Sequence, residues 1–275
     1  MKLGRGRVLG AAALAALGVI GFVGVLLTIE PRRTAMPALD VATSTISTDE
    51  LTEAARVKVF FGHVSVGENI LSGVGTLYRE LGVPEASMTE FDRDGALPLV
   101  APEGGIVHTI IGDNEDPLGK LKNFDTVLRA GLADEIDVAV LKFCYVDITR
   151  STDVTSLFQQ YRTTLAALER DFPEVTFVHS TAPLMVTPSG VKATLKSWLG
   201  RDDNVAREQY NTLMRQAYEP ERLFDIAAVE GTAPNGARSI ALYDGYTTDG
   251  GHLNETGSAL VAAELLRLIA AGDVS

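Results

Sequence analysis

The sequence has very few of the side chains that bind metals or cross-link chains. It contains one cysteine, Cys144, and four histidines in 275 residues. One cysteine excludes an internal disulfide, and inside an apolar run we expect its thiol to be a small buried group rather than a nucleophile. No two histidines have the His-x-x-x-His spacing of a zinc site. We therefore expect neither a metal nor an organic cofactor.

Basic side chains are also in the minority. The chain has 24 Lys and Arg against 36 Asp and Glu, which gives a formal net charge of −12. A nucleic-acid partner needs a basic face that neutralises phosphates, so we expect none. The acidity otherwise indicates little beyond solubility.

One long hydrophobic run is present, at the N-terminus. Val8–Ile29 has no charged residue over 22 positions, which is long enough to span a hydrocarbon core. We predict a signal-anchor or transmembrane segment over residues 1–33, a linker over 34–50, and one domain over 51–275 on the extracytoplasmic side of a cell membrane. The alternative is a long signal peptide whose cleavage leaves a secreted protein.

Short apolar runs alternate with amphipathic helical patterns through the rest of the chain. This alternation predicts an α/β fold, a three-layer α/β/α sandwich with a mostly parallel, flavodoxin-like sheet that binds ligands beyond the carboxyl ends of its strands. The expected strands are Val57–Phe61, Ala86–Arg93, Ile106–Ile111, Ile136–Tyr145, Val175–His179 and Leu223–Ala227. The expected helices cover 66–81, Pro117–Leu132, Thr152–Arg170, Asn204–Tyr218 and Glu255–Ala271.

Ser65 follows the first expected strand and precedes the first expected helix of this domain. A hydroxyl on such a turn is exposed, and the helix N–H groups beside it favour negative charge. That location suits a nucleophile whose attack creates an oxyanion. Serine is also a favoured N-cap residue, so a purely structural role is the competing interpretation.

Asp249 and His252 lie just before the last expected helix. At this spacing the carboxylate can bond one ring nitrogen and leave the other free to take a proton from a serine. Alone, the Asp-Gly-Gly-His sequence indicates a turn with a surface histidine. Because strand ends of a parallel sheet share one edge, this pair and Ser65 are expected to meet.

Two segments resemble a known family. FFGHVSVGENIL near the start and TTDGGHLN near the end are similar to the outer sequence blocks of the SGNH, or GDSL-type, hydrolases. The resemblance spans about Val57–Ala271 and implies Ser65 as nucleophile, His252 as general base and Asp249 as its orienting acid. The serine block departs from Gly-Asp-Ser, because two residues separate Gly62 from Ser65.

The oxyanion-hole positions match the family less well. The resemblance implies two backbone oxyanion donors, the N–H groups of Ser65 and of Gly112, which fits the position of the family's oxyanion glycine. The family's usual asparagine is missing from the block Cys144-Tyr145-Val146-Asp147. Losing one such donor typically costs about 100–1000-fold in rate. Asn114 is the candidate substitute, with a simple turn residue as the equal alternative.

Two further residues are candidate substrate contacts, His63 and Tyr145, although for His63 we favour a buried role in supporting the turn. The sequence thus predicts a membrane-tethered serine esterase that acts through an acyl-enzyme on a small-molecule, glycan or lipid ester, such as an O-acetyl glycan. An acyltransferase with the same triad is one alternative. A non-catalytic envelope binding protein on the same fold is the other, and the missing asparagine motivates it.

Overall fold

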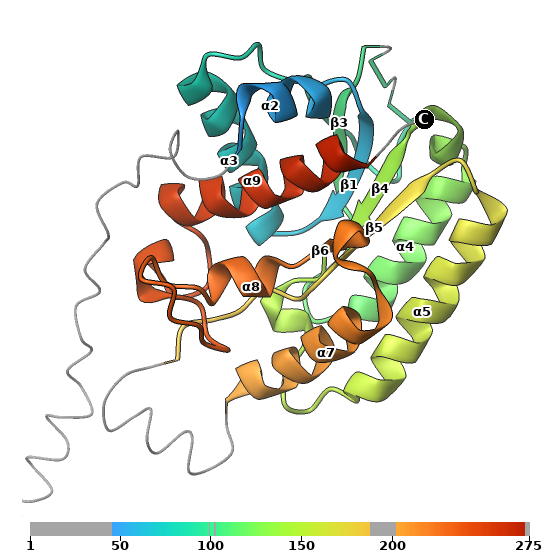
Figure 1. The fold of residues 1–275 in the computed structure, drawn as a ribbon. Helices are drawn as coiled ribbons and strands as arrows, with labels where there is room; N and C mark the ends of the chain where they lie inside the picture. Colours follow the sequence, from blue (N-terminus) through green and yellow to red (C-terminus); the bar gives the residue numbers. More distant parts are fainter. Residues whose placement is uncertain (1–45, 99, 102, 188–201, 273–275) are drawn as a thin grey trace, which may run out of the picture. The chain divides into compact units, whose positions relative to one another are not determined.

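The computed structural model describes residues 46–98, 100, 101, 103–187 and 202–272. Within them lies one six-stranded sheet in the order β2-β3-β1-β4-β5-β6, and every adjacent pair is parallel (Figure 1). The predicted α/β class and mostly parallel sheet are confirmed. The strands are β1 (Lys58–His63), β2 (Met88–Glu90), β3 (Gly105–Ile110), β4 (Val138–Leu141), β5 (Thr176–Ser180) and β6 (Leu223–Phe224).

Helices cover both faces of the sheet, as expected for parallel strands joined by crossover helices. Figure 1 shows α2, α3 and α9 together on one side, and α4 and α5 on the other. One buried cluster joins the first face to α2, α3, α8 and α9, and a second joins the other face to α4, α5 and α7. The helices are α2 (Thr48–Ala54), α3 (Val66–Leu81), α4 (Pro117–Arg129), α5 (Val154–Asp171), α7 (Asp203–Ala217), α8 (Ile226–Glu230) and α9 (Glu255–Ala271).

The α3–α9 contact depends on a glycine. A Cβ at Gly73 would lie 2.2 Å from the Ser258 carbonyl oxygen, so the backbones of α3 and α9 are too close at this point for any residue except glycine.

The helix ends follow the sequence signals closely. Gly82 ends α3 in the left-handed conformation, Asp116 caps α4, and Asn254 caps α9. This packing places the start of α9, and the loop before it, beside the start of α3.

Several elements differ from the sequence prediction. The expected strand Ala86–Arg93 is reduced to β2, Met88–Glu90. The expected strand Ile136–Tyr145 ends at Leu141 in β4, because the chain then turns into a short 3-10 helix, Tyr145–Asp147. The expected strand Leu223–Ala227 keeps two residues as β6, since Asp225 caps the start of α8. The expected helix Asn204–Tyr218 is observed as α7, Asp203–Ala217, and the Asp202 side chain accepts its capping hydrogen bond.

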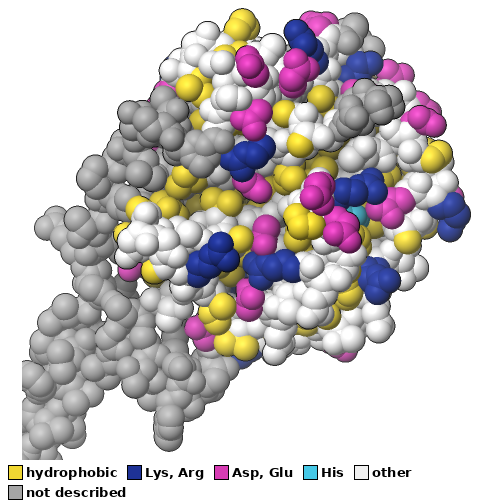
Figure 2. Space-filling model, in the orientation of Figure 1, with side chains coloured by type: hydrophobic (Ala, Val, Ile, Leu, Met, Phe, Trp, Pro, Cys, Tyr) yellow, Lys and Arg dark blue, Asp and Glu magenta, His cyan; other side chains and the backbone are white. Residues whose placement is uncertain are grey.

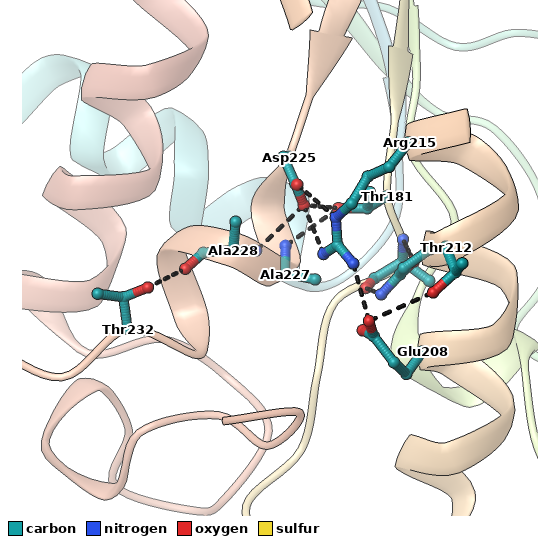
Figure 3. A network of polar contacts seen from close by, with 10 residues as sticks. Thr181, Glu208, Thr212, Arg215, Asp225, Ala227, Ala228 and Thr232 are labelled. Atoms are coloured by element: carbon teal, nitrogen blue, oxygen red, sulfur yellow. Dashed lines mark hydrogen bonds and ion pairs between the residues drawn. The ribbon is translucent and has the colours of Figure 1, made fainter. Parts of the chain in front are cut away.

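Asp225 also ties α7 to the end of β5 (Figure 3). Its carboxylate accepts hydrogen bonds from the Thr181 hydroxyl, from two guanidinium nitrogens of Arg215 and from the Ala228 N–H. The remaining guanidinium nitrogen of Arg215 bonds Glu208 at 2.9 Å. One carboxylate thereby fixes the position of a strand end and two helices.

The N-terminal prediction concerns residues that the structure does not describe. Val8–Ile29 and residues 34–45 of the expected linker lie outside the described ranges, and α2 begins at Thr48. Among the described residues no helix combines the length and apolarity needed to cross a membrane. On the face that Figure 2 shows, acidic and basic side chains are interspersed, so the negative charge is not gathered there.

Glu230, at the end of α8, makes stability depend on pH. Its carboxyl is fully buried, and one oxygen accepts the Leu184 N–H at 2.6 Å. Burial raises the pKa of Glu230 from 4.5 to about 8, although the Leu184 N–H, Lys142 and Arg207 act in the opposite direction. Between those pH values the folded chain holds a proton that the unfolded chain has lost.

We therefore expect Glu230 to reduce the free energy of unfolding as pH rises from 5 to 8. Compared with Glu230→Gln, the wild type should lose up to a few kcal/mol over this range. Urea unfolding at several pH values measures the difference, with the exposed Glu219→Gln as the matched control. If the wild-type and Glu230→Gln curves stay parallel from pH 5 to 8, Glu230 is ionised in the folded protein.

Candidate active site

Ser65 lies on the turn between β1 and α3, in a conformation that is unusual for a residue with a side chain. Its φ is 54° and its ψ is −100°, outside the favoured regions for L-residues. It occupies the N-cap position of α3, yet its side chain makes no capping hydrogen bond. The structural interpretation of Ser65 as a capping side chain is thus wrong. Strained backbone of this kind costs about 1–3 kcal/mol and is concentrated at functional sites.

The Ser65 hydroxyl instead contacts the histidine from the far end of the chain. Ser65 Oγ lies 2.5 Å from His252 Nε2, and His252 Nδ1 lies 2.7 Å from Asp249 Oδ2. The three side chains form a continuous hydrogen-bonded series in the order of a nucleophile, a base and an orienting acid. The side chains of His252 and Asp249 are 44 % and 54 % exposed, so solvent reaches the site.

Asp249 is held in its ionised form. Burial acts to raise its pKa, but hydrogen bonds from the Gly251 N–H, the His252 ring and the His252 N–H outweigh burial and hold the pKa well below its ordinary value. An ionised Asp249 accepts from His252 Nδ1–H, which fixes the tautomer that leaves Nε2 free to accept a proton. The electrostatics therefore favour His252 as a base towards Ser65.

The loop that carries His252 is fixed by contacts from three directions. The Thr247 hydroxyl donates to the His252 carbonyl at 2.5 Å, and Asn69 of α3 accepts from the Leu253 N–H at 3.2 Å. The Tyr145 ring meets the His252 ring edge-to-face, with centroids 5.8 Å apart. Tyr145, predicted as a substrate contact, thus packs against the base itself.

The first candidate oxyanion donors are backbone groups at the ends of β1 and β3. The Ile111 N–H bonds the His63 carbonyl at 3.0 Å, which places the Gly112 loop beside the nucleophile turn. Within the described ranges, the N–H groups of Ser65 and Gly112 donate to no protein acceptor. Both remain available to a substrate oxygen.

Asn114 lies on the same loop and is exposed. Its Oδ1 accepts a long hydrogen bond of 3.5 Å from Lys120 Nζ. Its amide nitrogen donates to no protein group in the described part of the chain. Asn114 therefore stays a candidate donor.

A fully buried ion pair supports this loop. Lys120 Nζ lies 2.7 Å and 2.6 Å from the two carboxylate oxygens of Asp147, and neither side chain is exposed. The Asp147 carboxylate also accepts hydrogen bonds from the backbone N–H groups of Glu115 and Cys144. Asp147 therefore braces both its own turn and the loop after β3, together with a lysine that no sequence pattern indicated.

Lys120→Met is expected to destabilise the fold by about 3–5 kcal/mol, because it leaves the Asp147 carboxylate buried without its cation. Urea unfolding of Lys120→Met and of Lys122→Met, an exposed lysine on the same helix, measures the difference. A loss below about 1 kcal/mol in Lys120→Met would show that the pair contributes little.

Lys142 is a second buried lysine that sequence reasoning missed. Its Nζ donates to the Val64 carbonyl at 2.8 Å, and burial lowers its pKa to about 8. The Val64 carbonyl belongs to the same peptide as the Ser65 N–H, so this hydrogen bond polarises the candidate oxyanion donor. The available signal was Lys142 itself, the one charged residue in the otherwise apolar stretch 138–145.

His63 lies under the nucleophile turn and is fully buried. Its Nε2 lies 3.1 Å from Nδ1 of His108 on the adjacent strand β3. The position agrees with a role in supporting the turn and removes His63 from the substrate contacts. Cys144 is buried, in agreement with its expected packing role.

No protein-family model matches the sequence, and no curated protein matches it. Among solved structures the chain is similar to a Streptococcus pneumonia protein described provisionally as a platelet activating factor. The two are 17% identical, and the similarity covers 91% of this chain and 97% of that chain with a TM-score of 0.48. A Desulfitobacterium hafniense DCB-2 protein described provisionally as a lipolytic protein of the G-D-S-L family gives 12% identity, 77% and 99% coverage, and a TM-score of 0.44. A peptidoglycan O-acetylesterase is 13% identical. The similarity covers 61% of this chain and 47% of that chain, with a TM-score of 0.39.

Proposed function

We propose that this chain is a serine esterase of the GDSL type. The observation that carries the proposal is the series Ser65–His252–Asp249, with contacts of 2.5 Å and 2.7 Å and with the serine on a strained turn. His252 Nε2 takes the Ser65 proton as Oγ attacks the ester carbonyl. The imidazolium then protonates the leaving alcohol, and water, activated by the same nitrogen, releases the acid from the acyl-enzyme.

The oxyanion that forms in each step would be held by the backbone N–H groups of Ser65 and Gly112. Two features of the described residues support this arrangement. Both N–H groups donate to no protein acceptor, and Lys142 polarises the peptide that contains the first of them. Asn114 is proposed as a third donor in place of the family's missing asparagine.

The substrate proposal comes from the surroundings of the Gly112 loop. A cavity beyond the ends of β2 and β3 is lined by four carboxylates and one arginine, together with Phe91, Thr109 and Ile110. Its charged residues are Glu90, Asp92, Arg93, Asp94 and Asp113. An excess of carboxylates disfavours anionic alcohols such as phosphate-bearing lipids. We propose a neutral, polar ester such as an O-acetylated glycan, and an extracytoplasmic location with Val8–Ile29 as membrane anchor.

The test is ester turnover by the full chain. We expect release of acetate from an activated acetyl ester and from an O-acetylated neutral oligosaccharide, and slower hydrolysis of an anionic phospholipid. Adding a free sugar acceptor distinguishes the acyltransferase, because acetyl groups would then appear on the acceptor rather than in water. Absence of turnover with every ester would favour a binding protein that retains the fold.

A further inference from the structure

A buried arginine on α7 bonds the residues that support the base loop (residues 247–253). Arg207 is only 3 % exposed, which is rare for a charged side chain. Its Nε donates to the Tyr145 carbonyl at 2.7 Å, and its Nη1 donates to Asn204 Oδ1 at 2.6 Å. Burying a guanidinium costs free energy, which hydrogen bonds to these two neutral acceptors offset only in part. What the two bonds do fix is the position of Tyr145 and Asn204 relative to α7.

Tyr145 connects this arginine to the catalytic base. The Arg207 guanidinium carbon lies 6.0 Å from the centroid of the Tyr145 ring, at the distance of a cation–π contact. The same ring meets the His252 ring edge-to-face, with centroids 5.8 Å apart. A Cβ at Gly251 would lie 2.8 Å from Tyr145 Cζ, so the ring also packs directly on the backbone of the base loop. Arg207 therefore reaches His252 through one aromatic side chain.

A second path runs from the same helix to the same loop. The buried Asn204 forms two hydrogen bonds with the Met185 backbone, accepting from its N–H at 3.1 Å and donating to its carbonyl at 2.6 Å. The next residue, Val186, donates its N–H to the Gly250 carbonyl at 2.9 Å. Because Arg207 bonds the same oxygen of Asn204, both paths begin at one hydrogen-bonded unit on α7.

The orientation of His252 depends on such support because solvent reaches the contact between His252 and Asp249. Both side chains are partly exposed, and ion pairs at exposed positions stabilise a given geometry only weakly. Among the described residues, Tyr145 supplies the one aromatic ring in contact with the imidazole. Displacing a catalytic group by about 1 Å costs about 100-fold in rate. The rate should therefore depend on the groups that hold the ring in place.

We propose that Arg207 is a positioning residue for His252 and acts through Tyr145. In the described structure it bonds none of the triad side chains. It holds the turn that carries Tyr145, and the segment 184–187, against the base loop, so that Nε2 of His252 stays directed at Ser65. For its effect on rate the proposal rests on the esterase reaction proposed above. Its effect on the position of the imidazole does not.

The kinetic test compares variants of the full chain with an activated acetyl ester. Arg207→Met keeps an unbranched side chain without its charge and donors, and should lower kcat about 10–100-fold with KM unchanged. Tyr145→Leu should lower kcat by a similar factor, whereas the conservative Tyr145→Phe should recover most of the wild-type kcat because it keeps the ring. The double variant Arg207→Met/Tyr145→Leu should be no slower than the slower single variant, since both changes break one path.

Arg162→Met is the matched control. Arg162 is exposed on α5, and its guanidinium also lies over an aromatic ring, that of Phe158, at 5.7 Å. Its replacement should leave kcat unchanged. Thermal unfolding of each variant separates a loss of rate from a loss of fold.

The position of the imidazole can be measured without any substrate. The chain has four histidines, so a ¹H–¹³C spectrum contains few ring signals, and His252→Ala identifies the signal of His252. Arg207→Met should move that signal in the same direction as Tyr145→Leu, because both changes withdraw the Tyr145 ring from the imidazole. Arg162→Met should leave it in place.

The two measurements distinguish failure of this proposal from failure of the esterase. A wild-type kcat and an unmoved His252 signal in Arg207→Met would overturn the positioning role and leave the esterase intact. A loss of kcat that Tyr145→Phe shares in full would also overturn it, because the hydroxyl rather than the ring would then be responsible. A signal that moves as expected in a protein that hydrolyses no ester would support the positioning contact and contradict the esterase.

Discussion

Ser65→Ala is expected to reduce kcat for an activated acetyl ester by about 10⁴-fold or more, because the acyl-enzyme can no longer form. The fold should persist. The Ser65 side chain makes no capping hydrogen bond, and alanine occupies the same backbone conformation at a similar cost. Steady-state kinetics measure the loss, and thermal unfolding checks the fold.

The matched control for this variant is Ser72→Ala. Ser72 is an exposed serine on the same helix, seven positions further along, and its replacement should leave kcat unchanged. A Ser65→Ala enzyme that retains a tenth of the wild-type rate would show that another group is the nucleophile.

Asp249→Asn is expected to lower kcat by about 10³–10⁴-fold with little change in KM. The asparagine amide donates where the carboxylate accepted, so His252 Nδ1 becomes an acceptor and Nε2 carries the proton. In that tautomer His252 cannot take the Ser65 proton. The backbone hydrogen bonds from Gly251 and His252 to Oδ1 can persist, so the loop should keep its position.

Asp244→Asn is the control for the aspartate variant. Asp244 is exposed in the short 3-10 helix Asp244–Tyr246, on the same loop, and has no contact with the triad among the hydrogen bonds of the described residues. Its replacement should not change kcat. If Asp249→Asn keeps more than a tenth of the wild-type kcat, the carboxylate does not control the His252 tautomer.

Sequence periodicity predicted most of the fold because its signals are local. Strand β1, the turn at Ser65, and helix α3 with its end at Gly82 follow from hydrophobic pattern and one glycine. The errors also have local causes. Asp225 stops β6 by capping α8, and β4 ends at Leu141 because the chain then turns into the 3-10 helix Tyr145–Asp147.

The meeting of Ser65 and His252 could be predicted because parallel strands bring their carboxyl ends to one edge, so residues 187 positions apart come into contact. The supporting groups could not. The Lys120–Asp147 pair and the bond from Lys142 to the Val64 carbonyl depend on which helix covers which strand end, a property that one sequence does not encode locally. The contact between His63 and His108 depends likewise on strand order and register.

The central claim is that the Ser65 hydroxyl is the nucleophile activated by His252. The most direct measurement is to treat the full chain with a fluorophosphonate and identify the modified residue by peptide mass spectrometry. The expected result is a stoichiometric adduct on Ser65 that is absent after heat unfolding and strongly slowed in His252→Ala. An adduct on a different residue, or no adduct on the folded protein, would contradict the account.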